Sequence, residues 1–205
     1  MSSARAVVAV AALALLAAGP RVEADARAAD ADLLNSERIE QRFGSYGVQV
    51  LESGPRLRIS NLFSGGADER IGRTFAVVTY PATIDPRLER EHGLILAGGS
   101  IGAVLAAHGW RVDKTHLYYG ELDSGPRVER LMGGLAPTKL AVHVYALDAV
   151  RDDARIRYAV LAEVHHPDYL RLEDLVEIYG EVAIGGETDA QAVAELLART
   201  AEALR

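Results

Sequence analysis

The sequence predicts an α+β fold in which a mostly antiparallel sheet of about six strands packs on a long helix at about residues 86–108. Three observations predict this fold. Six segments have strand patterns, short turns connect them in two groups, and a long run of small and apolar residues separates the groups. Short connections between successive strands favour antiparallel pairing. A short N-terminal helix and a longer C-terminal helix complete the prediction.

The N-terminus has the pattern of a bacterial signal peptide. Residues 6–18 form a continuous stretch of 13 apolar residues after Arg5, and small residues at Ala24 or Ala26 suit signal peptidase. This stretch is too short for a membrane anchor, which needs about 17 to 25 residues. We therefore expect a periplasmic or secreted protein without a stable membrane anchor. Its expected segments are a cleaved signal peptide at 1–24, a flexible leader at 25–34 and a single α+β domain at 35–205.

The composition argues against several classes of protein. There is no cysteine, which excludes disulfides, thiol catalysis and a lipid anchor at the cleavage site. The net charge is −7 and no basic run is present, so nucleic acid is not an expected partner. No cofactor motif is complete, and we expect no cofactor. The expected partner is an unidentified small molecule or protein.

The N-terminal part of the domain is predicted to hold a short helix and three strands. In the second strand, Leu57 and Ile59 alternate with Arg56 and Arg58, which predicts one buried face and one solvated arginine face. The predicted helix covers 36–43, and the predicted strands cover 46–52, 56–62 and 70–80.

The stretch at 86–108 has two interpretations, and we prefer a single helix. Asp85 can cap it, Pro86 suits its first position, and Gly109 suits a left-handed residue after its last turn. The glycines and alanines inside it would let the helix lie close to a sheet.

The alternative interpretation is catalytic. Residues 94–97 would form a strand, and Gly98 to Gly102 would form a G-x-S-x-G turn that presents Ser100 as the nucleophile of an esterase-like serine hydrolase. A histidine such as His165 or His166 would be its base. The pattern has only three fixed positions, and the hairpin-connected strands before it do not suit that fold.

The second group of strands contains the preferred binding site. The predicted strand at 110–121 places Trp110, Lys114, His116 and Tyr118 on one face. Ligand pockets combine aromatic surface with a few polar groups, so we expect these four residues to bind a ligand.

The hairpin predicted at 139–149 and 155–165 carries the remaining chemical candidates. Glu163 and His165 point the same way from the second strand, onto its wetter face, and could share a metal ion. Because a histidine pair at a strand end is more often solvated, we expect no metal; these two residues are the weak candidates.

Helical patterns fill the rest of the chain. The last helix begins near Asp189, and its apolar stripe is expected to dock on the sheet, with a homodimer interface as the alternative. Shorter elements are predicted at 127–132, 170–179 and 182–184. Taken together, the sequence predicts a non-catalytic binding or assembly module, with the Ser100 hydrolase as the alternative.

Overall fold

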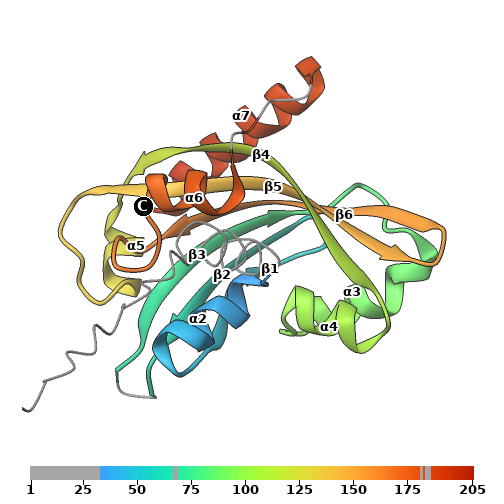
Figure 1. The fold of residues 1–205 in the computed structure, drawn as a ribbon, viewed down its shortest axis with the longest axis horizontal. Helices are drawn as coiled ribbons and strands as arrows, with labels where there is room; N and C mark the ends of the chain where they lie inside the picture. Colours follow the sequence, from blue (N-terminus) through green and yellow to red (C-terminus); the bar gives the residue numbers. More distant parts are fainter. Residues whose placement is uncertain (1–32, 67–68, 181, 183–185) are drawn as a thin grey trace, which may run out of the picture.

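The computed structural model describes residues 33–66, 69–180, 182 and 186–205. Within them, a six-stranded antiparallel sheet has helices on both of its faces (Figure 1). The predicted α+β fold is therefore confirmed. The predicted signal peptide, most of the leader and most of the short strand at 182–184 lie outside the described residues. The strands are β1 (Gly47–Ser53), β2 (Leu57–Ser64), β3 (Ile71–Thr79), β4 (Arg111–Asp123), β5 (Lys139–Arg151) and β6 (Ala154–His165).

The sheet consists of two three-stranded meanders that meet at β3 and β6. The strand order is β1-β2-β3-β6-β5-β4, with every neighbouring pair antiparallel. At the junction, Thr74 lies opposite His165 and Thr79 opposite Val160. All six predicted strands are present, and the predicted hairpin turns at Asp152, which has a positive φ of 53°.

The helices follow the predicted positions, with one correction. They are α2 (Asn35–Phe43), α3 (Glu89–Leu96), α4 (Ile101–Ala107), α5 (Pro126–Leu131), α6 (Leu172–Tyr179) and α7 (Gly186–Ala203), together with the 3₁₀ helix η1 (Pro86–Leu88).

The correction concerns the long helix predicted at 86–108, which is divided into η1, α3 and α4. Asp85 begins the segment as expected, because its carboxylate accepts a hydrogen bond from the Arg87 N–H. The helix ends before Gly98, whose φ is +115°. Glycine adopts this backbone conformation without strain, whereas other residues do not. The alternative was also wrong about a strand at 94–97, since α3 extends to Leu96. Neither the single helix nor the strand-turn-helix is formed.

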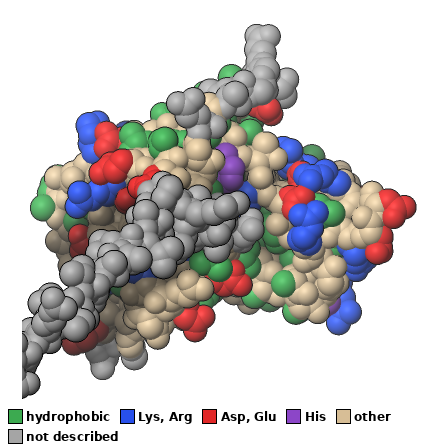
Figure 2. All heavy atoms as spheres, in the orientation of Figure 1, with side chains coloured by type: hydrophobic (Ala, Val, Ile, Leu, Met, Phe, Trp, Pro, Cys, Tyr) green, Lys and Arg blue, Asp and Glu red, His purple; other side chains and the backbone are tan. Residues whose placement is uncertain are grey.

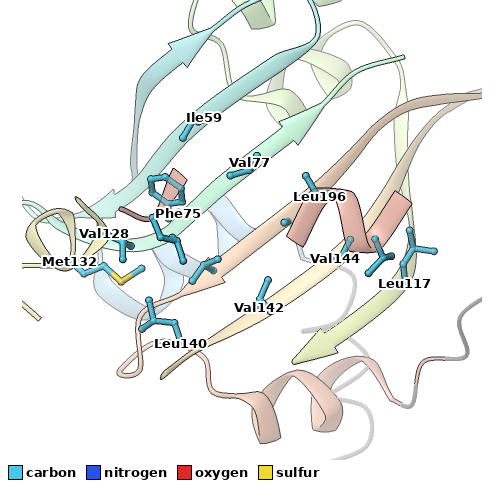
Figure 3. Packing of buried hydrophobic residues seen from close by; sticks show 14 of the residues in the cluster. Ile59, Phe75, Val77, Leu117, Val128, Met132, Leu140, Val142, Val144 and Leu196 are labelled. Atoms are coloured by element: carbon cyan, nitrogen blue, oxygen red, sulfur yellow. The ribbon is translucent and has the colours of Figure 1, made fainter. Parts of the chain in front are cut away.

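One face of the sheet carries the main apolar core. Phe75 and Val77 from β3 pack with Val142 and Val144 from β5, and α5 and α7 cover them (Figure 3). The apolar stripe of α7 docks on this face, as expected. Its core residues are Val193 and Leu196, and Leu204 follows just after the helix.

The other face is covered at two ends by different helices. At one end, η1, α3 and α4 pack on an apolar cluster that includes Trp110, Leu147 and Leu161. At the other end, α2 and α6 pack around Ile39 and Leu175. Figure 1 shows α2 and the α3–α4 pair on the same side of the sheet, with α7 on the opposite side.

A buried polar strip separates these two apolar clusters. Arg58, Glu163 and His165 are 2%, 6% and 1% exposed, respectively. The prediction of a solvated arginine face was therefore wrong at Arg58. The predicted wetter face of β6 was wrong at Glu163 and His165, whereas Arg155 and Arg157 are exposed as expected. Covering helices bury both faces of the central strands, which period-two alternation within one strand does not reveal.

Candidate functional site

A small cavity lies on the polar strip, between the sheet and the ends of α2 and α4. Its volume is about 70 Å³. Side chains of β1, β2, β3, β5 and β6 form its floor, and residues near the starts of α2 and α4 form its rim. The apolar lining includes Val48, Leu62, Val78, Ile101, Leu147 and Leu161, and the polar lining includes Tyr46, Arg58, Ser60, Ser100, Lys114 and Glu163.

Arg58 is the buried cation of this cavity. Its Nε donates to the Ser60 hydroxyl at 2.9 Å, and its Nη1 donates to the carbonyl oxygens of Ile95 and Gly99 at 2.9 and 2.7 Å. These partners are all neutral. Within the described ranges, Arg58 makes no ion pair with a carboxylate. No described carboxylate therefore lies within ion-pair distance of this positive charge in the cavity wall.

The exposed arginines of the sheet are paired differently. Asp148 accepts from Arg155 at 2.6 Å and from Arg157 at 2.5 Å. Figure 2 shows basic and acidic side chains interspersed over the described part of the face in view. Uncompensated positive charge is therefore a property of the buried Arg58 and not of these surface arginines.

Glu163 and Lys114 form the opposite part of the wall. Lys114 donates from Nζ to the Leu33 carbonyl oxygen at 3.2 Å and lies 5.5 Å from the centre of the Tyr145 ring. Burial raises the pKa of Glu163, and the opposing effects of Lys114 and of hydrogen bonds with Asn35 and Tyr145 are smaller. The carboxyl group therefore holds its proton at higher pH than an ordinary glutamate.

Ser100 lies on the rim, immediately before α4. Burial raises the pKa of the nearby Tyr46 hydroxyl, and the Ser100 side chain partly offsets this effect. The Ser100 carbonyl oxygen accepts from the Val104 N–H at 2.9 Å. Among the described residues, no histidine is hydrogen-bonded to Ser100. The structure thus places the predicted nucleophile at the cavity without the base that a serine hydrolase needs.

The four predicted ligand-binding residues of β4 are distributed over different surroundings. Lys114 lines the cavity and His116 contacts His143, whereas Trp110 is buried in an apolar cluster beneath Arg151. Tyr118 packs against the core of the opposite face. Trp110, Lys114 and His116 therefore lie on one face of the sheet as expected, and the expectation was wrong for Tyr118.

The reason is a β-bulge in β4. The register with β5 shifts between His116 and Tyr118, and Tyr119 lies opposite His143. After the bulge, the residues that face each side of the sheet are therefore exchanged relative to the predicted alternation. Gly120 marks a close approach beyond the bulge, which an isolated glycine inside a strand favours. A Cβ on Gly120 would overlap the Tyr118 ring.

A histidine-rich cluster extends the polar strip beyond the cavity. His143 on β5 lies opposite Glu163 on β6, and each of the residues His143, Glu163 and His165 has a potential ligand atom within 4.8 Å of the other two. The prediction that Glu163 and His165 point the same way is confirmed. His166 makes a separate contact, because its Nδ1 accepts from the Asp168 N–H at 3.0 Å.

His143 was not predicted as a partner of this pair. Its Nε2 lies 2.8 Å from Nδ1 of His116, and the two rings stack with centroids 4.9 Å apart. The predicted hairpin was the available signal, because cross-strand neighbours in an antiparallel pair share a face.

Comparison with known proteins gives little support for any particular function. No protein-family model and no curated protein matches this chain. Among solved structures, it is similar to the ligand-binding domain of a proposed GntR-family transcriptional regulator from Bordetella bronchiseptica. The TM-score is 0.38 and the identity 13%, over 62% of this chain and 87% of that one. A TM-score this low supports no inference about function.

None of the helices in the described part of the chain is long and apolar enough to cross a bilayer.

Proposed function

We propose that this protein is a non-catalytic binding module whose ligand is a small organic anion held in the cavity beside Arg58. The observation that carries this proposal is a buried guanidinium in the cavity wall that has only neutral partners among the described residues. A buried charge without a counter-charge is unfavourable, and a ligand carboxylate would supply one. Guanidinium groups bind carboxylates through strong charge-assisted hydrogen bonds.

The cavity walls support a ligand with a short apolar body. A water-sized probe occupies about 10–15 Å³, so a cavity of about 70 Å³ admits only a few heavy atoms. Val48, Val78 and Leu161 offer apolar contacts, while Tyr46 and Ser100 offer hydroxyl groups. Apolar walls with a few polar groups are typical of small-molecule sites.

The charges around the cavity favour an anion over a cation. Lys114 adds a second positive group to the wall. Burial raises the pKa of Glu163, which favours its neutral form. A neutral carboxyl group can donate a hydrogen bond to an anion, whereas a carboxylate would repel it.

The proposed place of action is the periplasm or the extracellular space. This part of the proposal is supported by the signal-peptide pattern at residues 1–24. The module would then meet its ligand after export.

Calorimetric titration with matched pairs of probes tests the binding proposal. Acetate, isobutyrate and benzoate are each compared with acetamide, isobutyramide and benzamide, which have similar shapes and no charge. A hydrogen bond to a charged group contributes about 1.5–3 kcal/mol, so we expect at least one carboxylate to bind about tenfold or more tightly than its amide. Equal affinities within every pair, or no saturable binding of any carboxylate, would overturn the proposal.

The two lysines of the chain provide a matched control. Lys114→Met removes a positive charge from the cavity wall, and Lys139→Met removes one from an exposed strand end. We expect the first substitution to weaken carboxylate binding and the second to leave it unchanged. Equal effects would show that binding depends on net charge and not on the cavity.

A further inference from the structure

We propose that His143, Glu163 and His165 bind one divalent transition-metal ion of the zinc class. The three side chains come from adjacent strands, β5 and β6, and all are buried. Imidazole nitrogen and carboxylate oxygen are the ligand atoms that zinc takes in sites with three protein ligands. This site shares Glu163 with the proposed anion site, which uses the neutral carboxyl group, whereas the metal site uses the carboxylate.

The backbone positions the three ligands before any ion binds. Their potential ligand atoms lie within 4.8 Å of one another, whereas a tetrahedral ion at about 2.0–2.1 Å from each needs them about 3.3 Å apart. The sheet fixes the backbone through the pairing of His143 with Glu163. Binding therefore requires the three side chains to move closer together by rotation on a backbone that the sheet holds in place.

His165 shows the clearest signature of a missing partner. Its Nε2 is buried and has no hydrogen-bond partner in the described structure. Its Nδ1 lies 3.1 Å from the hydroxyl of Thr74, which also accepts a hydrogen bond from Asn35 at 3.1 Å. Partners of this kind orient the ligating histidines of metal sites through the other ring nitrogen.

His143 is held in the same way by a different neighbour. Its Nε2 lies 2.8 Å from Nδ1 of His116, and its own Nδ1 has no hydrogen bond among the described residues. Each histidine of the cluster thus has one nitrogen close to an outer partner and one without a hydrogen bond among the described residues. Outer partners of this kind orient histidine ligands in metal sites.

The charges around the cluster weigh against tight metal binding. The positive charges of Lys114 and Arg38 near Glu163 oppose a cation, and Glu163 must release any proton it holds. The site is therefore expected to be weaker than a structural zinc site.

Zinc titration of the full chain, purified without a histidine tag and stripped with a chelator, tests the proposal. A chromophoric competitor reports the affinity, elemental analysis reports the stoichiometry, and cobalt substitution reports the coordination geometry. We expect one zinc per chain and a cobalt spectrum of low coordination number. Because no carboxylate buffer is used, this result is independent of anion binding.

Substitutions then locate the ion. Glu163→Gln keeps the shape of the side chain and removes its charge, and His165→Asn removes the ring. We expect each to weaken zinc binding by about tenfold or more, as the loss of a ligand should exceed the effect of losing an outer partner. His108→Gln is the matched control, because the His108 ring binds the Val104 carbonyl oxygen elsewhere. Circular dichroism checks the folding of each variant.

Two results would overturn the metal site. One is the lack of stoichiometric zinc binding by the unmodified chain. The other is unchanged zinc affinity in folded Glu163→Gln, which decides the question even where His165→Asn fails to fold. In either case the cluster is a buried hydrogen-bond network without an ion.

Discussion

Arg58 on β2 donates a hydrogen bond of 2.7 Å to the carbonyl oxygen of Gly99, in the turn between α3 and α4. The same guanidinium nitrogen binds the Ile95 carbonyl oxygen near the end of α3. One side chain of the sheet therefore satisfies the Gly99 carbonyl oxygen, for which no backbone donor is found among the described residues. It adds a further bond to the Ile95 carbonyl oxygen, which also accepts from the Gly98 N–H at 3.0 Å. The residue that charges the cavity also positions the turn on its rim.

This double role predicts that Arg58→Met destabilises the fold. The methionine fills much of the same space but leaves the Gly99 carbonyl oxygen without its hydrogen bond from Arg58, which costs about 1–3 kcal/mol and outweighs the relief of a buried charge. Urea unfolding followed by circular dichroism measures the change. Arg56→Met, on the exposed end of the same hairpin, should stay within about 0.5 kcal/mol of the unmodified chain. A stable Arg58→Met variant would argue against this role.

Two glycines of the interrupted helix are predicted to respond in opposite directions to alanine. Gly98 has a φ of +115°, so Gly98→Ala should destabilise the protein by about 1–2 kcal/mol. Gly93 lies inside α3, and a Cβ there meets nothing within 4 Å. Gly93→Ala should therefore stabilise by about 0.5–1 kcal/mol. Denaturant midpoints of the two variants check this, and a shift in the same direction would contradict the structure of the turn.

The fold could be predicted from the sequence further than the site could. The alternation of apolar and polar residues along each strand, together with the short turns between strands, was sufficient to predict six strands and their antiparallel pairing. The break at Gly98 was not resolved, because apolar spacing through 86–108 also suits one continuous helix. The hydrogen bonds of Arg58 to this turn were not predicted either. The residue pattern of a strand does not reveal which helix covers its face.

The cavity was only partly predictable. Lys114 was expected at a binding site and lines the cavity. Ser100 also lines it, but the sequence suggested this residue as a nucleophile and not as part of a binding site. Tyr118 was lost from the predicted face because a single bulge inverts every position after it. Long-range neighbours such as Tyr46 and Glu163 meet only through the strand order, which local periodicity does not determine.

Asp148 predicts how stability depends on acid. Burial raises its pKa, but the hydrogen bonds and charges of Arg157 and Arg155 outweigh burial and hold the pKa below the ordinary value of 3.8. A carboxyl group with a lowered pKa in the folded state stabilises the fold above its unfolded-state pKa. That stability is lost as the pH falls through the folded-state pKa.

Asp148→Asn tests this relationship. At pH 7 we expect it to lower the free energy of unfolding by about 1–3 kcal/mol, and below about pH 4 we expect its pH dependence to be flatter than that of the unmodified chain. Unfolding curves at a series of pH values measure both. Asp123→Asn, at a carboxylate that is 85% exposed, should have little effect at any pH.

Ser100 is predicted to be unreactive toward serine-hydrolase probes. This residue lies on the rim of the cavity, and no described histidine is hydrogen-bonded to its side chain. Incubation with a fluorophosphonate, read by intact mass, should give no labelling of the unmodified chain. Stoichiometric labelling that disappears in Ser100→Ala would instead establish an activated serine and refute the non-catalytic function.

The most direct test of the anion site is a methyl NMR titration with isobutyrate, with isobutyramide in parallel. We expect isobutyrate to shift the methyl resonances of Val48, Val78 and Leu161, which line the cavity, and to leave those of Val77 and Val164 on the opposite face unchanged. Isobutyramide should produce much smaller shifts at the same concentrations. Equal responses to the acid and the amide, or shifts confined to methyl groups outside the cavity, would contradict an anion site beside Arg58.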